Sequence, residues 1–293
     1  MRLYYIILLV LLLAAYACHA APSPKASATL WQLPEQTQTQ MMSYVIRTTK
    51  GRVVVIDGGT YGDAPYLKAF LKKNGGRVEA WFITHPHTDH CSALAGILTH
   101  PEGIAIGRMY ASLPKVEWVR DYEPYAARTL EALNEAASGA KKCFAELVPG
   151  EVLDFDEVRI EVLAVKNPEI HTNALNNSSV ALRMQDPTKS VLFLGDLGPE
   201  AGEKLLASKY AKRLRADYVQ MAHHGQQGVT EEFYKAVSPS YCLWTTPEWL
   251  WENDQGDGPG TGPWKTLEVR AWMEKMPVKR HYVTWIDGLV EIR

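Results

Sequence analysis

The sequence has few cysteines and no excess of basic charge. Its 293 residues include only 4 cysteines, and none of them forms the C-x-x-C pair that is typical of zinc-binding cysteines. The formal net charge is -2, so no basic field over the whole chain points to nucleic acid. Hydrophobic residues make up 46% and charged residues 22%, as in ordinary globular proteins. We therefore expect a globular protein without a cysteine metal site, and nucleic acid is not a favoured partner.

The N-terminal segment has the pattern of an export signal. The apolar run from Tyr5 to Ala15 follows Arg2 and leads into small residues up to Ala21. We predict a signal peptide over 1–21, a polar linker over 22–29, and an exported protein in the periplasm or outside the cell. Two alternatives remain open: a lipid anchor at Cys18, and a membrane helix, since the uncharged stretch approaches the roughly 20 residues that span a bilayer.

The remainder, 30–293, is predicted to be one layered α/β domain, because short apolar strands alternate with amphipathic helices and no internal repeat is seen. Strands are predicted at 43–48, 52–56, 78–84, 104–112, 152–155, 158–165, 179–184, 191–195, 218–222 and 241–245. Helices are predicted at 64–73, from 90 onward, and at 123–137, 199–210, 231–236 and 266–275. A loop is expected over 249–262, and 281–285 with 289–292 is expected to form a closing hairpin.

The chemistry-bearing motif is His85-Pro86-His87-Thr88-Asp89-His90. Imidazole and carboxylate are good ligands for zinc and similar ions. The motif follows a buried-type strand and enters a helix, so a tight turn there directs neighbouring side chains to different points. We predict that His85 and His87 bind one ion while Asp89 and His90 face a second ion.

Two later segments place ligand-type residues in the same way, directly after a strand. Asp196 follows the apolar strand 191–195, and its carboxylate can bridge two cations with one oxygen facing each. Taken alone, Asp196 is better interpreted as an N-cap of the helix that begins near Pro199. The pair His223-His224 follows the strand 218–222. Ligand clusters that each follow a strand are expected to meet at one edge of a sheet.

These motifs resemble those of the metallo-β-lactamase superfamily. The matching residues are Asp57, His85, His87, Asp89, His90, Asp196 and the pair His223-His224. The resemblance implies a four-layer αββα sandwich with a dinuclear metal site between two sheets. It implies zinc as cofactor, with manganese or iron as alternatives, and it implies that Asp57 orients the histidine loop. An equally good interpretation makes Asp57 a turn residue.

A narrower resemblance links the chain to the hydrolase domain of competence DNA-uptake proteins and to phosphorylcholine esterases. It is carried by 176–182 (Asn-Asn-Ser-Ser-Val-Ala-Leu), 194–196 and 223–225. Two departures stand out. Many superfamily members place a metal-binding histidine before the strand near Ser179, where this chain has Asn176 and Asn177, and the nearest histidine is His171. Gln226 stands where the uptake proteins usually have serine.

The resemblance implies an exported hydrolase that uses a metal-bound hydroxide, most often on a phosphodiester. The metal ligands would be His85, His87, Asp89, His90, Asp196 and His224, with Asp89, Asp196 and His223 as the catalytic residues. Which of the two adjacent histidines binds metal stays open. The expected substrate is a small-molecule or cell-envelope phosphodiester, and nucleic acid is a less favoured one. The alternatives are an ester, lactone or amide hydrolase, and a catalytically idle metal-binding protein.

Aromatic residues are dense towards the C-terminus, at Trp244, Trp249, Trp251 and Trp264. They either form a substrate wall that holds a cationic group or a sugar, or pack in the core. Packing is the favoured role. A second wall from Trp118, Tyr122 and Tyr125 rests on weaker grounds. Export would permit one disulfide among Cys91, Cys143 and Cys242, but buried free thiols are the favoured interpretation.

Overall fold

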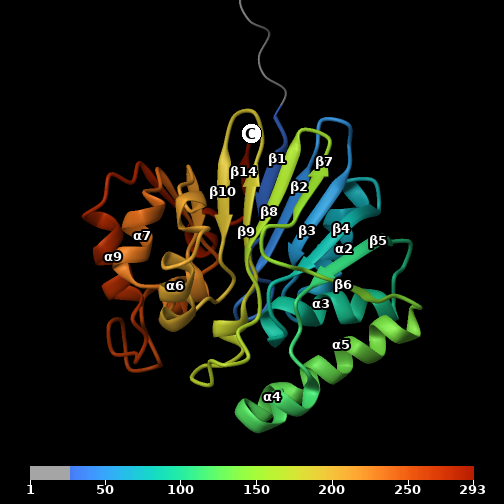
Figure 1. Ribbon diagram of the computed structural model, residues 1–293, viewed down its shortest axis with the longest axis horizontal. Helices are drawn as coiled ribbons and strands as arrows, with labels where there is room; N and C mark the ends of the chain where they lie inside the picture. Colours follow the sequence, from blue (N-terminus) through green and yellow to red (C-terminus); the bar gives the residue numbers. More distant parts are fainter. Residues whose placement is uncertain (1–26) are drawn as a thin grey trace, which may run out of the picture.

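Two β-sheets pack face to face, with helices on the outer face of each, in the computed structural model of the protein (Figure 1). The structure describes residues 27–293, so the predicted signal peptide and residues 22–26 of the predicted linker lie outside the described residues. Within the described part, each sheet contains seven strands. The helix–sheet–sheet–helix layering is the predicted four-layer α/β sandwich.

The first sheet has the strand order β14-β1-β2-β3-β4-β5-β6. Its first four strands in this order pair antiparallel, and β3 to β6 run parallel. The bounds are β1 Thr29–Gln32, β2 Ser43–Arg47, β3 Val53–Asp57, β4 Arg77–Ile83, β5 Ala105–Ala111, β6 Phe144–Glu146 and β14 Val290–Ile292.

The second sheet has the strand order β13-β12-β11-β10-β9-β8-β7. Here β7 to β10 pair antiparallel, and β10 to β13 run parallel. The bounds are β7 Val152–Phe155, β8 Val158–Ala164, β9 Ala181–Gln185, β10 Ser190–Phe193, β11 Tyr218–Gln220, β12 Tyr241–Trp244 and β13 Arg280–Val283.

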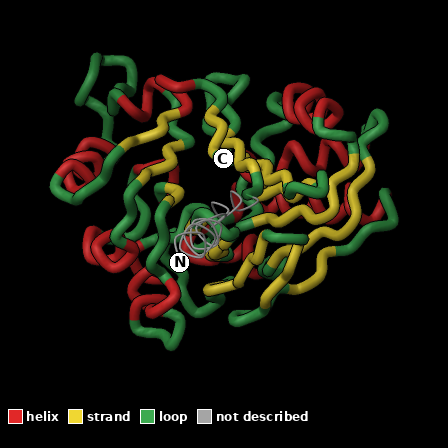
Figure 2. Tube along the Cα trace, turned by 90° about the horizontal axis from the view of Figure 1, so that it is seen from above, coloured by secondary structure: helices red, strands yellow, loops and turns green. Residues whose placement is uncertain are grey.

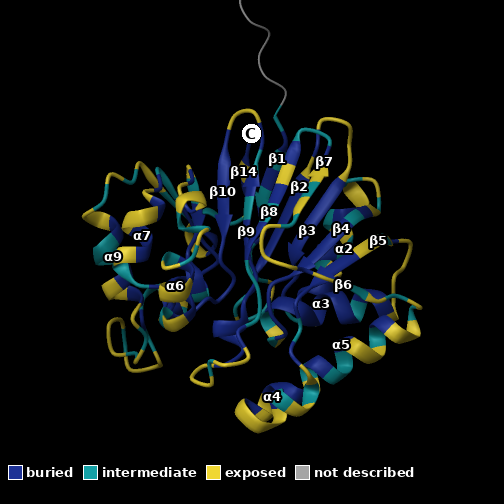
Figure 3. Ribbon diagram, viewed as in Figure 1, coloured by how far each residue is buried: buried dark blue, intermediate teal, exposed yellow. Residues whose placement is uncertain are grey.

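The central strands are buried on both faces, which is why they read as apolar runs rather than as alternating patterns. All five residues of β3 and all four of β10 are buried. Between the sheets lies a core to which both contribute, with Phe82 from the first sheet and Phe193 from the second. The dark interior strands in Figure 3 show this burial.

The outer helices form the other two layers, as the view from above in Figure 2 shows. Against the first sheet pack α2 (Ala64–Lys73), α3 (Thr88–Thr99) and α5 (Ala127–Gly139). Against the second sheet pack α6 (Pro199–Leu206), α7 (Glu231–Val237) and α9 (Thr266–Glu274). The helix α4 (Val116–Tyr122) precedes α5, and α8 (Glu248–Trp251) precedes α9.

Several sequence predictions of local structure were wrong. The closing hairpin does not form, because β13 joins the edge of the second sheet while β14 pairs with β1 in the first. A short helix, α10 (Thr284–Asp287), separates these two strands. The helix predicted from 123 begins at Ala127, after a 3-10 turn at Pro124–Ala126, and the predicted loop over 249–262 overlaps α8.

The strand β1 near the N-terminus was not predicted from the sequence either. The strand β1 starts at Thr29, inside the predicted linker, and Ala28 is buried. The buried Asp186 carboxylate accepts a 3.1 Å hydrogen bond from the Ala28 backbone N–H and lies 2.8 Å from Lys189 Nζ. This pair anchors the start of β1, which no hydrophobic periodicity could have indicated.

Within residues 27–293, no helix combines the length and the apolar character needed to cross a bilayer.

Candidate metal centre

Four segments that are distant in the sequence deliver side chains to one place between the two sheets. Asp57 ends β3, and the loop after β4 carries His85 and His87 into α3. Asp196 follows β10, and the 3-10 turn η4 (Ala222–Gly225) follows β11. The strand pattern predicts that these loops meet at the edge of one sheet, but β3 and β4 belong to the first sheet and β10 and β11 to the second. The loops meet because these strands of both sheets end on the same side of the sandwich.

Asp196 occupies the middle of this cluster, and its two oxygens face different partners. Oδ1 lies 3.2 Å from His90 Nε2 and 3.7 Å from His224 Nε2. Oδ2 lies 3.8 Å from His85 Nε2. The carboxylate is buried. This division is the arrangement required of a carboxylate that bridges two cations.

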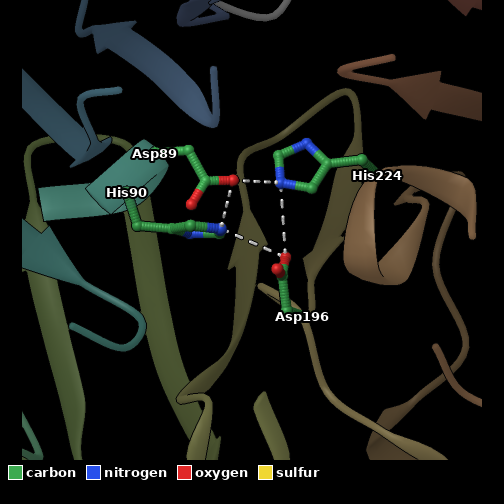
Figure 4. Close-up of side chains that lie close together, drawn as sticks. All are labelled: Asp89, His90, Asp196 and His224. Atoms are coloured by element: carbon green, nitrogen blue, oxygen red, sulfur yellow. Dashed lines mark ion pairs between the residues drawn. The ribbon is translucent and has the colours of Figure 1, made fainter. Parts of the chain in front are cut away.

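One group of potential ligands consists of Asp89, His90, Asp196 and His224, whose ligand atoms all lie within 4.8 Å of one another. Figure 4 shows these four side chains pointing towards a common centre. Asp89 Oδ2 is 3.0 Å from His224 Nε2 and 3.8 Å from His90 Nε2. Two imidazole nitrogens and two carboxylates form a donor set suited to zinc, iron or manganese.

A second group consists of His85, His87 and Asp196, again within 4.8 Å. His85 Nε2 and His87 Nδ1 lie 3.0 Å apart. We call this group the first cation site and the four-residue group the second cation site. The division of the H-x-H-x-D-H motif between two sites agrees with the sequence prediction for His85, His87, Asp89 and His90.

In three of these histidines, the ring nitrogen that points away from the centre forms a hydrogen bond, and this bond determines which nitrogen is left as the ligand atom. His90 Nδ1 donates to Asp57 Oδ2 at 2.9 Å, and His224 Nδ1 donates to the Thr245 carbonyl at 2.8 Å. Both histidines therefore turn the lone pair of Nε2 towards the centre. His87 Nε2 donates to Glu123 Oε2 at 3.0 Å, which leaves Nδ1 as the ligand atom.

Several polar atoms at the centre form no hydrogen bond within residues 27–293, although ligand-type groups of opposite charge lie close to them. Among the described residues, His90 Nε2, His224 Nε2 and Asp196 Oδ1 are buried and have no hydrogen-bond partner. Buried polar atoms are nearly always satisfied, and each unsatisfied one costs about 1–3 kcal/mol. Divalent cations would satisfy all three atoms, so the residues present fit the metal that this chemistry implies.

The charges at the centre are strongly coupled. Burial opposes the charge on His90, but Asp196, Asp57 and Asp89 outweigh it and raise the pKa of His90 well above its usual value. Burial also acts against ionisation of Asp196, yet His90 and His224 hold its pKa well below its usual value. Burial lowers the pKa of His85, which is therefore a neutral ligand.

The backbone at His223-His224 is strained. Both residues have left-handed conformations, with φ of 53° and 55°. Such geometry is uncommon in residues other than glycine and is often found at functional sites. Gly225 follows with φ of 82°, and a Cβ there would lie 2.3 Å from the Trp244 ring. The strain turns His224 into the second cation site and leaves His223 beside it.

A pocket of about 340 Å³ opens onto the centre. Its lining is polar, and Ala126 is its only aliphatic member among the described residues. His223 lies in the pocket wall, with Nε2 3.8 Å from Asp196 Oδ2. The lining residues are Gln40, His87, Thr88, Asp89, Tyr125, Ala126, Thr129, Asn173, Asn176, Asp196 and His223.

Other candidates fall outside the centre. His171 stacks on Tyr122 with ring centroids 3.9 Å apart and belongs to neither group of potential ligands. Trp244 and Trp251 pack against each other in the core, as favoured. Trp249 and Trp264 instead line a separate cleft of about 860 Å³ together with Trp285. Of the weaker aromatic set, only Tyr125 reaches the pocket.

Glu123 is the residue of the site that sequence reasoning missed. It is 36 positions from His87, it lies at the start of the helix predicted over 123–137, and no motif marks it. It is buried, and its Oε1 also accepts the Leu175 backbone N–H at 2.9 Å. The only indication in the sequence is that residue 123 is a glutamate, because a carboxylate that becomes buried needs a partner.

A model of the metallo-beta-lactamase superfamily matches residues 37–233, which is more than half of the chain. No protein of curated function matches the sequence significantly.

Solved structures match over most of the chain at low identity. The metallo-beta-lactamase fold protein YhfI from Bacillus subtilis has 10% identity and a TM-score of 0.56, covering 91% of this chain and all of its own. CmlA, a diiron beta-hydroxylase from Streptomyces venezuelae, has 14% identity and a TM-score of 0.51, covering 93% of this chain but 55% of its own. At such identities these similarities establish the fold alone, and they agree with the predicted four-layer sandwich.

Proposed function

The chain belongs to the metallo-β-lactamase superfamily, and from this premise we propose that it is a metal-dependent hydrolase that acts on a phosphodiester. The observation that carries the proposal is the position of Asp196. Its two oxygens face two separate groups of ligand-type side chains, and the unpaired buried atoms of the centre call for cations. Two adjacent sites that share a carboxylate beside an open pocket form the arrangement that two-metal hydrolysis uses.

The residues that would hold the cations follow from the geometry. His85, His87 and Asp196 would hold one, and Asp89, His90, His224 and Asp196 the other. When bound, two divalent cations supply Lewis acidity and bring the ionisation of water close to neutral pH. Zinc is the proposed metal, with manganese and iron as alternatives.

The pocket suits a small and strongly polar reacting group. The hydroxyls of Thr88 and Thr129 and the amide of Gln40 line the pocket and can donate hydrogen bonds to phosphoryl oxygens. No lysine or arginine lines the pocket among the described residues. An anionic phosphodiester would therefore bind only when cations offset its charge, and this couples substrate binding to metal loading. An apolar ester or lactam would find little apolar wall.

His223 is positioned to move a proton. Its Nδ1 donates to the Gln227 carbonyl at 3.1 Å, so Nε2 carries the lone pair that faces the pocket. Burial lowers the pKa of His223, which keeps the ring neutral before reaction. In the proposed reaction, Nε2 accepts a proton from the attacking water as the new P–O bond forms. The leaving oxygen departs on the opposite side of the phosphorus and takes its proton from water in the open pocket as the old P–O bond breaks, and His223 then releases its proton to solvent.

The exported location and the natural substrate rest on the sequence. The segment 1–21 supports export to the periplasm or the outside of the cell. There the chain would meet small-molecule or cell-envelope phosphodiesters, while nucleic acid is the less favoured substrate. N-terminal sequencing of the protein recovered from cell fractions tests this part, and an intact residue 1 on a cytoplasmic product would contradict it.

A substrate panel tests the hydrolase proposal. Metal-free protein is loaded with Zn²⁺ or Mn²⁺ and offered chromogenic phosphodiesters, phosphomonoesters, carboxylic esters and lactones. We expect turnover of a phosphodiester that requires added metal and exceeds that of every carboxylic ester. Turnover of esters alone would overturn the phosphodiester assignment, and bound metal without any turnover would favour an idle binding protein.

A further inference from the structure

We propose that the side-chain oxygen Oδ1 of Asn176 is the fourth protein ligand of the first cation site. This inference rests on the dinuclear centre of the proposed function. It concerns the position before β9 where the sequence lacks the histidine that many related proteins have. The structure offers Asn176 there, and not His171, as the residue that completes the site.

Asn176 Oδ1 is buried without a hydrogen-bond partner, as are three atoms of the second cation site. Asn176 is 3% exposed, and its Oδ1 is buried with no hydrogen-bond partner among the described residues. The centre contributes three other atoms of this kind, His90 Nε2, His224 Nε2 and Asp196 Oδ1. All three belong to the second cation site. Other buried atoms without a partner do not fit a cation: Gln40 Nε2 and Trp249 Nε1 can only donate, and the hydroxyls of Ser43, Ser92 and Thr266 do not line the pocket. Asn176 Oδ1 shares with Asp196 Oδ1 both the acceptor character and the pocket position that a ligand requires.

The orientation of the amide is determined by its neighbours. Asn176 Nδ2 lies 3.0 Å from Asn173 Oδ1 and 3.3 Å from His223 Nε2. Both partners are acceptors, since His223 already uses its Nδ1 proton on the Gln227 carbonyl. A rotated amide would set its oxygen against two acceptors, so the observed orientation holds. Oδ1 therefore has free lone pairs and accepts no hydrogen bond from the described residues.

The segment that carries Asn176 is held firmly against the first cation site. Asn176 begins the 3-10 turn η2 (Asn176–Ser178), and Ser179 follows it directly. Ser179 Oγ lies 3.2 Å from His85 Nδ1 and accepts the Asp196 backbone N–H at 3.1 Å. Asn176 also lines the pocket that contains His87 and Asp196. A mobile loop would not keep an unsatisfied amide oxygen there at a cost of about 1–3 kcal/mol.

The consequence is that both cation sites have the same kind of donor set. With Asn176, the first cation site offers two imidazole nitrogens, one carboxylate oxygen and one amide oxygen. The second offers two imidazole nitrogens and two carboxylate oxygens. Oxygen ligands suit manganese and magnesium better than a set of three imidazoles would. We therefore expect the two sites to fill together, and the chain to accept Mn²⁺ readily beside Zn²⁺.

Metal stoichiometry tests the assignment without any substrate. Metal-free wild type, Asn176→Ala, Asn176→His and the control His171→Ala are loaded with Mn²⁺, dialysed and analysed by elemental mass spectrometry. Electron paramagnetic resonance reports whether two Mn²⁺ ions are coupled. We expect two coupled ions in wild type and in His171→Ala, and about one uncoupled ion in Asn176→Ala. In Asn176→His we expect two ions, with zinc preferred over manganese at least about tenfold more than in wild type.

Two results would overturn the proposal: two tightly held ions in Asn176→Ala, or the loss of one ion in His171→Ala. If Asn176→Ala fails to fold, Asn176→His decides, because an unchanged zinc-to-manganese ratio in that variant excludes Asn176 as a ligand. The hydrolase proposal is tested separately by turnover. The expected stoichiometries without hydrolysis of any substrate would refute the enzyme and leave the Asn176 ligand standing.

Discussion

Asp57 Oδ2 lies 2.9 Å from His90 Nδ1 and accepts a 2.7 Å hydrogen bond from Thr84 Oγ1, so one fully buried carboxylate orients both the histidine and the loop that carries it. Partners of this kind raise the basicity of a ligand and hold its ring in place. The interpretation of Asp57 as an orienting residue therefore fits the geometry better than that of a simple turn residue.

Asp57→Asn should weaken cation binding by about 10–100-fold, because the amide cannot stabilise the charged or metal-bound form of His90 as a carboxylate does. Competition against a chromophoric chelator measures the affinity. Asp63→Asn is the matched control, since Asp63 is equally buried but accepts from Thr60 and Gln36 rather than from an imidazole. Equal affinities in Asp57→Asn and wild type would contradict the role.

Asp196→Ala should reduce turnover by about 10³-fold or more, because it removes the one side chain shared by both cation sites. Circular dichroism should show a folded protein, and steady-state rates on the best phosphodiester give the effect. Asp254→Ala, in the loop after α8, serves as a control with unchanged turnover. Wild-type activity in Asp196→Ala would refute the two-cation arrangement.

Substitutions at the adjacent histidines should separate metal binding from proton transfer. His224→Gln removes a nitrogen 3.0 Å from Asp89, so we expect loss of a cation together with activity. His223→Gln should keep both cations and lower kcat by about 10²-fold, with the dependence of the rate on pH altered. Metal analysis and pH–rate profiles distinguish the two. If instead His223→Gln lost a cation and His224→Gln kept both, His223 would be the metal ligand and His224 the proton-transfer residue.

Glu123→Gln should weaken the first cation site selectively, by about tenfold, because Glu123 Oε2 holds the His87 Nε2 proton at 3.0 Å. Burial raises the pKa of Glu123, but hydrogen bonds from His87 and from the Leu175 N–H outweigh it and lower the pKa overall. Stepwise metal titration resolves the two sites. Tyr125→Phe removes only a neighbouring 2.8 Å hydrogen bond and should have a much smaller effect. Equal weakening of both sites would argue against the assignment.

Asp186→Asn should destabilise the protein by about 3 kcal/mol at pH 7, since Lys189 would be left buried and unpaired. Burial opposes ionisation of Asp186, but Lys189 and the Thr188 N–H lower its pKa below the usual 3.8. A lowered pKa contributes stability that is present above 3.8 and is lost as the pH falls through the folded-state value. The difference between variant and wild type should therefore shrink in acid.

Urea unfolding at several pH values measures this difference. Asp154→Asn, which breaks only the exposed pair with Arg159, should change stability far less. A difference for Asp186→Asn that stayed constant from pH 7 to pH 3 would show that the carboxylate charge is not what anchors β1.

The sequence predicted the site better than it predicted the edges of the fold, for a physical reason. The His85 motif follows the seven-residue β4, and Asp196 follows β10, whose four residues are all buried. The apolar runs of these strands are strong local signals, and the motif spacing carries a resemblance to a family with a metal site between two sheets. The partners β1 and β14 are four and three residues long, and they pair across the whole chain. Periodicity cannot choose a partner at that distance, so the hairpin of 281–292 was a wrong local choice.

The hydrogen bonds that orient the ligand histidines could not be predicted from the sequence either. Nothing in the chain marks Glu123 as a neighbour of His87, or Thr245 as the acceptor for His224, because these contacts arise from packing of segments with no shared motif. Ligand types in a tight spacing can be predicted from sequence, whereas the groups that orient them depend on the fold.

The pairing of β1 with β14 also constrains how the protein is made. Trp31 Nε1 donates to Glu291 Oε2 across 260 positions, so β1 cannot pair with β14 until residues 290–292 have been synthesised. During synthesis β1 would expose an unpaired edge to other nascent chains, and contacts of such separation form slowly. We therefore expect the unfinished chain to depend on chaperones. We also expect aggregation to limit the yield of native protein when the chain is refolded at high concentration. Both effects would follow from the late pairing of this three-residue strand.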